Sequence, residues 1–428
     1  MPQGSQPTTE PNARRIMVYS HDAFGLGNLR RMLAICQHLL AHVPQLSILL
    51  VSGSPMIHEF RLPKGLDYIK LPCLNRGTSG ELSAKYLGTS LEETVALRSH
   101  LIQLAAAHFK PNLILVDKKP AGLHGELSAT LSDLQTKRSG SKCILLLRDI
   151  LDKPEKIVGE WSRRRYYATI QTYYDQILVV GMQSVFDLVR EYKLPPSAAR
   201  KVRYCGYIRK PLATQERVTP LALNRSEDCT KNYTEDCTKN YTERRVVVTP
   251  GGGEDGYSLV SHYLNGLEAL AEPAFHSRIV CGPEMPAGQQ QQLKQLAASC
   301  QEVAFQSFTS QSLSYLQSAD VVVSMGGYNT LSEALSFHKS VVVMPRTHPS
   351  QEQLIRATRF AQKNWVKMVH PERANGRSLM QAVLSQLANP LPPPADIDFN
   401  GLPQVAQHIS QLMPSLQPRT SAQIGLLA

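Results

Sequence analysis

The most constraining feature of this sequence is a pattern of short aliphatic runs, separated by longer stretches with helical periodicity, that occurs twice along the chain. Runs of this length match buried strands, and the helical stretches between them match crossovers of a parallel sheet. The first series comprises residues 15–20, 46–51, 113–116, 143–147, 176–180 and 201–205, and the second comprises 246–249, 279–281, 303–306, 321–324 and 341–344. We therefore predict an α/β fold with two tandem Rossmann-like, doubly wound domains that face a central cleft.

The chain length supports two domains, because single hydrophobic cores stop growing at roughly 250–300 residues and this chain has 428. The expected parts are a disordered tail (1–13), a first domain (14–212), a linker (213–243), a second domain (244–395) and a C-terminal tail (396–428). In the linker the octapeptide EDCTKNYT occurs twice in tandem, which is typical of a repeat expansion in a tolerant loop. An amphipathic segment at 405–412 predicts a terminal helix that packs back on the first domain.

Composition limits the functional classes. A hydrophobic content of 42% and a charged content of 19% indicate a globular chain. The net charge of +11 favours an anionic partner without choosing one. The eight cysteines include no CxxC pair, which favours a reducing cytoplasm. No apolar run reaches the roughly 18–20 residues of a membrane-spanning helix, so we expect any contact with the inner face of a membrane to be peripheral.

Glycine-rich turns follow two of the strands in the second series. The first turn contains Gly251, Gly252 and Gly253, and the second contains Gly326 and Gly327 followed by a helix from residue 331. Ligands of open α/β sheets bind at the carboxyl ends of strands, where backbone N–H groups and a helix dipole attract anions. The turns are therefore candidate pyrophosphate sites, and tight strand–helix connections are the alternative.

Polar residues flank the second glycine turn. Asn329 and Thr330 follow it directly, and Glu333 comes three residues after Thr330, so that Thr330 and Glu333 match a capping box. The alternative for Glu333 is a contact with the vicinal hydroxyls of a ribose. Arg346 and Gln353 follow the strand at 341–344, where they can reach a phosphate or a sugar; a solvated helix start is the alternative for the glutamine.

The first domain begins with a different glycine loop. Gly25 and Gly27 lie between the first strand and its helix, but Arg30 occupies the place of the third glycine of a dinucleotide-binding fingerprint. This substitution argues against NAD. His21 and Asp22 are candidate bases for an acceptor hydroxyl, with a structural hydrogen bond and a turn cap as their respective alternatives.

Three further features each have a non-functional interpretation beside any functional one. Charges at residues 117–119 and 148–149 follow strands and suit either acceptor binding or salt-bridged loop closure. Residues 161–174 predict one basic-aromatic helix, which suits an anionic membrane interface or a nucleic-acid backbone but is more typical of a partly buried helix on the domain surface. No metal-ligand motif occurs, and the aspartates at 396 and 398 lie outside the strand pattern.

The residues around the second glycine turn carry a family resemblance. The stretch 319–335 reads ADVVVSMGGYNTLSEAL and is followed by Pro345, Arg346 and residues 353–357. It resembles the donor region of GT-B glycosyltransferases of the MurG-like family, which transfer N-acetylglucosamine from its UDP derivative to a cell-wall lipid intermediate. The glycine loops at 251 and 25–27 and the residues 206–209 extend the resemblance to both halves.

The resemblance implies a metal-independent glycosyltransferase without a cofactor, which uses a nucleoside-diphosphate sugar, with UDP as the expected nucleotide. Glu333 would bind the ribose, the two glycine turns the pyrophosphate, and Arg209 would neutralise charge. The partners implied are this donor and an unidentified hydroxyl acceptor, with no nucleic acid. A UDP-sugar epimerase of the same fold is the alternative enzyme.

One residue departs from the family pattern. Relatives usually carry His after the second glycine of the first-domain loop, where this chain has Asn28, and a neutral amide cannot act as a base. Either His21 or Asp22 supplies that function, or the chain is a catalytically impaired nucleotide-sugar-binding protein.

Overall fold

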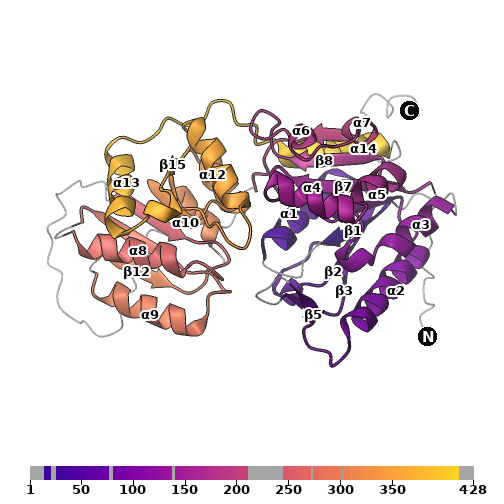
Figure 1. Cartoon of the computed structure of the whole chain (residues 1–428), viewed down its shortest axis with the longest axis horizontal. Coiled ribbons are helices and arrows are strands. Elements are labelled where there is room, and N and C mark those ends of the chain that lie inside the picture. The colour runs from indigo at the N-terminus through magenta and orange to yellow at the C-terminus, as the bar shows by residue number, and fades with distance from the viewer. Residues whose placement is uncertain are drawn as a thin grey trace, which may run out of the picture. The chain divides into compact units, whose positions relative to one another are not determined.

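The computed structural model describes residues 14–20, 26–76, 81–136, 140–210, 244–270, 273–300, 302–309 and 311–413. The predicted N-terminal tail and linker lie outside these residues, as do His21, Asp22 and Gly25. The described residues form two compact units, one that ends at Tyr207 and resumes at Asn400, and one that spans Ile208–Phe399. Each unit contains its own parallel sheet (Figure 1).

The sheet of the first unit has seven parallel strands in the order β3-β2-β1-β6-β7-β8-β9. Their bounds are β1 Arg14–Ser20, β2 Leu46–Ser52, β3 Leu66–Lys70, β6 Leu113–Asp117, β7 Lys142–Arg148, β8 Gln176–Val180 and β9 Val202–Tyr204. Central β6 is buried throughout, as its uninterrupted aliphatic sequence requires. The prediction missed β3, because its sequence LDYIK is half-exposed at the sheet edge and has no aliphatic run. The antiparallel pair β4 (Leu74–Arg76) and β5 (Leu82–Ala84) was missed as well.

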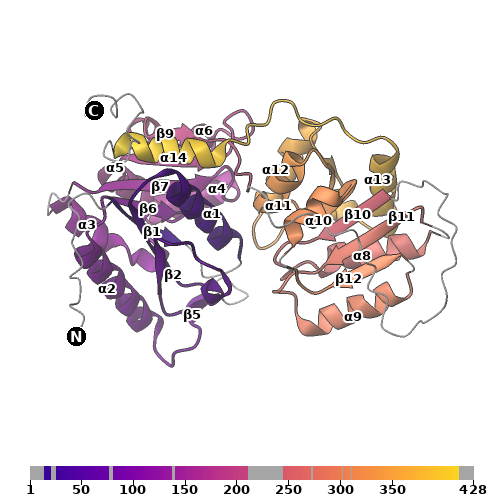
Figure 2. The same ribbon diagram turned by 180° about the vertical axis from the view of Figure 1, so that it is seen from behind.

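The helices of this unit pack on both faces of the sheet (Figures 1 and 2). They are α1 Leu26–His42, α2 Leu91–Phe109, α3 Ser128–Thr136, α4 Pro154–Arg163, α5 Tyr166–Tyr173, α6 Leu188–Glu191, α7 Pro196–Ala199 and α14 Gly401–Leu412. The terminal helix α14 lies beside α1, and the Gly401 N–H donates to the Tyr207 carbonyl at 3.0 Å. The last helix in the sequence therefore belongs to the first unit.

The prediction of one helix over 161–174 is wrong. The chain breaks between α4 and α5, where Arg165 has φ 56°, in the left-handed region. Trp161 and Tyr166 on either side of the break are buried, because each helix turns its aromatic residues toward the core.

The second unit has six parallel strands in the order β12-β11-β10-β13-β14-β15. Their bounds are β10 Arg244–Thr249, β11 Phe275–Val280, β12 Val303–Gln306, β13 Val321–Ser324, β14 Ser340–Val343 and β15 Lys367–Met368. The helices α8 Tyr257–Glu268, α9 Ala287–Ala298 and α13 Gly376–Ala388 share one core with the sheet, and α10 Ser312–Ser318, α11 Tyr328–Ser336 and α12 Glu352–Gln362 also pack against it. The strand order reverses between β10 and β13, which makes their junction a topological switch point. The doubly wound architecture predicted for both halves is confirmed.

A buried polar network stabilises the first unit. Arg98 of α2 makes two hydrogen bonds to the carboxylate of Glu126, at 2.5 and 2.7 Å, and both side chains are nearly inaccessible to solvent. The Tyr19 hydroxyl of β1 donates to the same carboxylate at 2.5 Å. Burial, followed by the charge of Glu126, raises the pKa of Tyr19 well above its ordinary value, so the phenol stays a donor.

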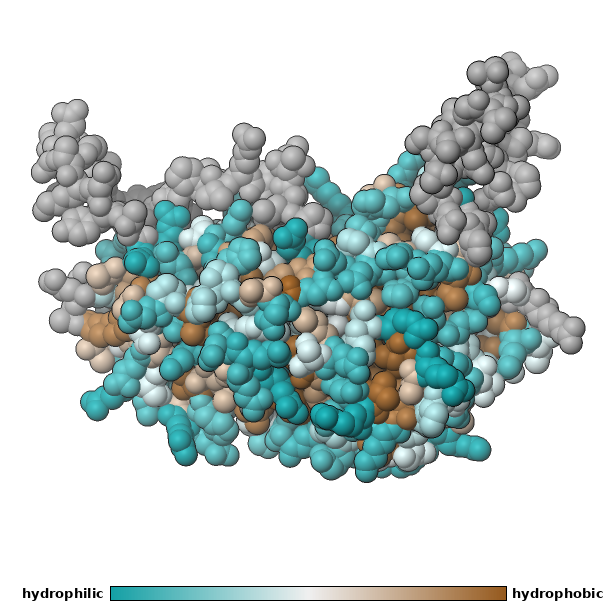
Figure 3. All heavy atoms as spheres, turned by 90° about the horizontal axis from the view of Figure 1, so that it is seen from above, coloured by the Kyte–Doolittle hydropathy of each residue, from teal (hydrophilic) through white to brown (hydrophobic). Residues whose placement is uncertain are grey.

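No described helix is both long enough and apolar enough to cross a membrane. On the face shown in Figure 3, hydrophobic residues are scattered among hydrophilic ones.

Glu126→Gln will destabilise the first unit by about 3–5 kcal/mol, because it leaves the buried Arg98 guanidinium without a counter-charge. The chain has two tryptophans, so a Trp365→Phe background leaves Trp161 as a fluorescence reporter of the first unit in urea denaturation. Lys142→Met serves as the control, because it removes the ion pair of Lys142 with Asp175, whose side chains are 42% and 32% exposed. It should lower the free energy of unfolding by less than about 1 kcal/mol. Equal losses in the two variants would contradict the importance of the network.

Candidate functional site

The two glycine turns lie side by side in the second unit. Residue pairing aligns Thr249 at the end of β10 with Ser324 at the end of β13, so the turns that follow leave the same edge of the sheet. Each turn leads into a helix, α8 after Gly256 and α11 after Gly327, and neither N-terminus has a side-chain cap. Two helix N-termini without side-chain caps thus lie at the switch point, an arrangement suited to an anion.

The first turn packs directly on the backbone that follows β11. Gly253 has φ +97°, and a Cβ there would lie 2.3 Å from the carbonyl oxygen of Cys281. The Gly252 carbonyl accepts the Glu284 N–H at 2.9 Å. Gly251 differs, because it has φ +88° and a Cβ there would meet no atom within 4 Å. The close contact with the backbone after β11 therefore explains why residue 253 is a glycine, whereas Gly251 borders open space.

The second turn likewise contains one closely packed glycine and one that borders open space. Gly326 has φ +81°, donates its N–H to Ser324 Oγ at 3.2 Å and accepts from Arg356 at 3.2 Å through its carbonyl. A Cβ at Gly326 would lie 3.0 Å from Val343, so the close packing and the positive φ together favour glycine at this position. Gly327 has open space around its Cβ position. Asn329 and Thr330 lie half-buried in the first turn of α11.

Glu333 is not part of a capping box, and that alternative is wrong. The helix α11 begins at Tyr328, three residues earlier than the expected start, so Thr330 lies inside its first turn and Glu333 in the second. The Glu333 side chain is buried, and its Oε1 pairs with Lys210 Nζ at 2.9 Å. Glu333 therefore has no capping role in α11, and it pairs instead with Lys210, which the sequence did not indicate.

The first residues of the second unit run along α11. The Ile208 N–H donates to the Tyr328 hydroxyl at 3.2 Å, and Ile208 and Tyr328 are both buried. Arg209 is exposed, and Lys210 reaches Glu333. The only signal for Lys210 in the sequence is its place directly after the residues 206–209 that carry the family resemblance.

Arg346 and Gln353 support the first glycine turn. Arg346 Nη1 pairs with Asp255 Oδ2 at 2.8 Å, and the Gln353 side-chain oxygen accepts the Arg346 N–H at 3.4 Å. Burial lowers the pKa of Arg346, but the hydrogen bond and charge of Asp255 outweigh it, so the pKa lies above its ordinary value. The contact joins the residues after β14 to the turn after β10.

In the first unit, Asn28 lies in the first turn of α1 with Gly27. Its side-chain oxygen accepts from Arg31 Nη2 at 3.1 Å, and the same guanidinium nitrogen pairs with the buried Asp117 at 2.7 Å. Asn28 therefore helps to orient a buried ion pair at the end of β6.

The other charged strand ends also have structural partners. Lys119 pairs with Glu160 of α4, and Asp149 accepts the Tyr207 hydroxyl at 2.9 Å. These contacts favour loop closure over acceptor binding.

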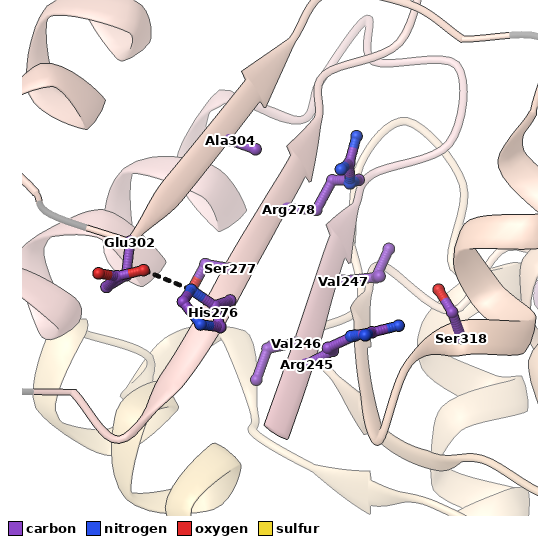
Figure 4. Close-up of a pocket in the computed structure, with 9 residues that line it drawn as sticks. All are labelled: Arg245, Val246, Val247, His276, Ser277, Arg278, Glu302, Ala304 and Ser318. Atoms are coloured by element: carbon purple, nitrogen blue, oxygen red, sulfur yellow. Dashed lines mark ion pairs between the residues drawn. The ribbon is translucent and has the colours of Figure 1, made fainter. Parts of the chain in front are cut away.

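A small cavity lies at the opposite end of the second sheet, near the amino ends of β10 and β11 (Figure 4). Its volume is about 20 Å³, room for one water molecule. Arg245, Arg278 and the ion pair of His276 with Glu302 lie around it. The cavity is too small for a nucleotide, whose sites measure several hundred Å³.

No group of three or more His, Cys, Asp or Glu side chains in the described part of the chain is arranged to hold a metal ion. The aspartate at 396 accepts from Trp365 Nε1 at 3.0 Å and lies near Lys363.

Three solved structures illustrate the similarity of the whole chain. MurG of Acinetobacter baumannii has a TM-score of 0.52 at 11% identity, with 96% of this chain and 98% of that chain covered. A UDP-glucosyltransferase of Polygonum tinctorium has a TM-score of 0.54 at 12% identity, over 96% and 95%. The UDP-N-acetylglucosamine 2-epimerase of Neisseria meningitidis, solved with its UDP-sugar, has a TM-score of 0.57 at 13% identity, over 94% and 99%.

A comparison with curated proteins finds no match to the sequence. A comparison with protein families agrees with the structural similarity. Residues 246–411 match the glycosyltransferase family 28 C-terminal domain, and this range contains the two glycine turns and Glu333. The chain thus matches the family 28 C-terminal domain over residues 246–411 and shares the two-domain fold of the GT-B glycosyltransferases, so its resemblance to the MurG-like family is confirmed.

Proposed function

We propose that this protein transfers a sugar from a UDP-sugar to the hydroxyl group of an acceptor, without a metal ion. The observation that carries the proposal is the pair of helix N-termini without side-chain caps at the switch point, with open space at Gly251 in the turn before α8 and at Gly327 directly before α11. Glu333 lies in the second turn of α11. This arrangement offers N–H donors to a diphosphate and a carboxylate to a sugar diol.

The parts of the nucleotide fit different parts of this site. The backbone at Gly251 and Gly327, with Asn329 and Thr330, would contact the pyrophosphate, while the Glu333 carboxylate accepts hydrogen bonds from the ribose hydroxyls. As the bond to the sugar breaks, negative charge develops on the departing diphosphate. The helix dipoles and the exposed Arg209 would stabilise this charge and so replace a metal ion.

The acceptor needs a base. His21 or Asp22 would take the proton of the attacking hydroxyl, because Asn28 has no basic atom and its amide oxygen is engaged by Arg31. A single displacement at the anomeric carbon inverts its configuration.

The second candidate is a UDP-sugar epimerase, since such an enzyme shares the fold. Product analysis separates the two, because epimerisation needs no acceptor.

Glu333→Ala will weaken UDP binding about tenfold, because the ribose loses a charged hydrogen-bond acceptor. Calorimetry with UDP, UDP-sugars and NAD on the intact protein measures the effect, and NAD should not bind. Glu372→Ala, which removes an exposed carboxylate of the same unit, is the control and should leave UDP affinity unchanged. A folded wild type that does not bind UDP would refute the donor site.

His21→Ala or Asp22→Asn will reduce sugar transfer by about 10²–10⁴-fold, the usual contribution of a general base. UDP affinity should stay at the wild-type value, because both residues precede the donor-binding half. Release of UDP in the presence of an acceptor panel measures the rate. Full activity in both variants would exclude these residues as the base.

The acceptor side offers an observation on membrane contact. Among the described residues of the first unit, the exposed large hydrophobic side chains are Tyr86, Leu87, Leu97 and Leu104, and Leu104 of α2 is 58% exposed. Apolar side chains on a basic protein suit peripheral binding to an anionic bilayer.

Co-sedimentation with vesicles of phosphatidylglycerol and phosphatidylcholine tests this contact. Leu97→Ser with Leu104→Ser should reduce the bound fraction severalfold without loss of stability, because both side chains already face water. Leu384→Ser, an exposed leucine of the second unit, serves as the control. Binding that is unchanged in the double variant would argue against contact through α2.

A further inference from the structure

Glu333 is a carboxylate whose burial demands compensation. Its side chain is 10% exposed, and an ionised carboxylate removed from water needs a counter-charge or several hydrogen bonds. The N-terminus of α11 does not supply them, because the effect of the helix dipole is confined to the first turn and Glu333 lies in the second. The partner that the fold provides is Lys210, whose Nζ lies 2.9 Å from Oε1.

Lys210 reaches this position because the backbone before it is fixed. Ile208 is buried, and its N–H is bonded to the hydroxyl of Tyr328 on the same helix as Glu333. Tyr328 is itself held by packing, with the Arg356 guanidinium 5.7 Å from the centre of its ring. Two contacts with α11, at Tyr328 and Glu333, therefore align the segment 208–210 with the helix. Arg209 between them remains exposed.

We infer that Lys210 is a positioning residue of the donor site, which holds the Glu333 carboxylate in the orientation that the two ribose hydroxyls of the nucleotide require. The inference rests on the proposed function. A carboxylate offers about four acceptor sites on its two oxygens, and Lys210 occupies one of them on Oε1. Sites on both oxygens remain for a vicinal diol, so ribose and Lys210 bind Glu333 together.

The two adjacent cations thus have different tasks. Arg209 is exposed and suits the diphosphate, whereas Lys210 acts on the ribose through Glu333. Uridine, which has the ribose but no phosphate, separates these tasks experimentally. A residue that acts through Glu333 affects uridine and UDP alike, and a residue that binds phosphate affects UDP only.

The experiment compares Lys210→Met and Arg209→Met in the full-length protein, with UDP affinity measured by calorimetry and uridine affinity by ligand-detected NMR titration. Lys210→Met should weaken both ligands by the same factor, at most about tenfold, because its effect cannot exceed that of removing Glu333 itself. Arg209→Met should weaken UDP and leave uridine unchanged. Lys210→Arg should retain most of the affinity, because it keeps the charge next to Glu333.

The decisive control places Lys210→Met in the Glu333→Ala background. There the lysine substitution should cause no further loss, because the group through which it acts is gone. Weakening of UDP alone, or an equal further loss in the Glu333→Ala background, would overturn the role of Lys210. Absence of UDP binding in the folded wild type would instead refute the donor site and the inference with it. Thermal melting checks the fold, and Lys210→Gln replaces any variant that does not fold.

Discussion

The arrangement of the second unit depends on the parallel pairing of β10 with β13. These strands are far apart in the sequence, and their aligned ends bring two glycine turns and two helix N-termini to one edge of the sheet. The backbone there is tightly packed, since a side chain at Gly253 would collide with the Cys281 carbonyl. Without this pairing the turns would be two unrelated connections, and no anion could meet both.

The remaining polar residues of the site act mainly through one another. Arg346 holds Asp255 beside the first turn, Arg356 binds the carbonyl of Gly326, and Lys210 holds Glu333. Each cation therefore fixes a group in one of the two glycine turns or on α11. Rigid support of this kind keeps hydrogen-bonding groups in place before the ligand arrives, which lowers the entropy lost on binding.

The first unit has a separate source of order in the buried network of Tyr19, Arg98 and Glu126. Asn28 belongs to a comparable buried group with Arg31 and Asp117. Its amide thus has a structural task of its own, at a position where a histidine is usual in the family that the sequence resembles. The proposed reaction therefore assigns the base to His21 or Asp22.

The sequence by itself determined the doubly wound architecture, because buried parallel strands such as β6 and β13 must be aliphatic along their whole length. It also located the two glycine turns, since positive φ angles such as those of Gly251, Gly253 and Gly326 strongly favour glycine. The edge strand β3 was not predicted, because a half-exposed strand has no continuous aliphatic run.

Tertiary structure alone decided which groups meet at the site. A capping box and a ribose contact have the same sequence signature at Thr330 and Glu333, and only the start of α11 at Tyr328 excludes the cap. The pairing of Lys210 with Glu333 joins residues that lie 123 positions apart. No local pattern encodes such a contact, because the chain between the two residues must first fold into a sheet that brings them together.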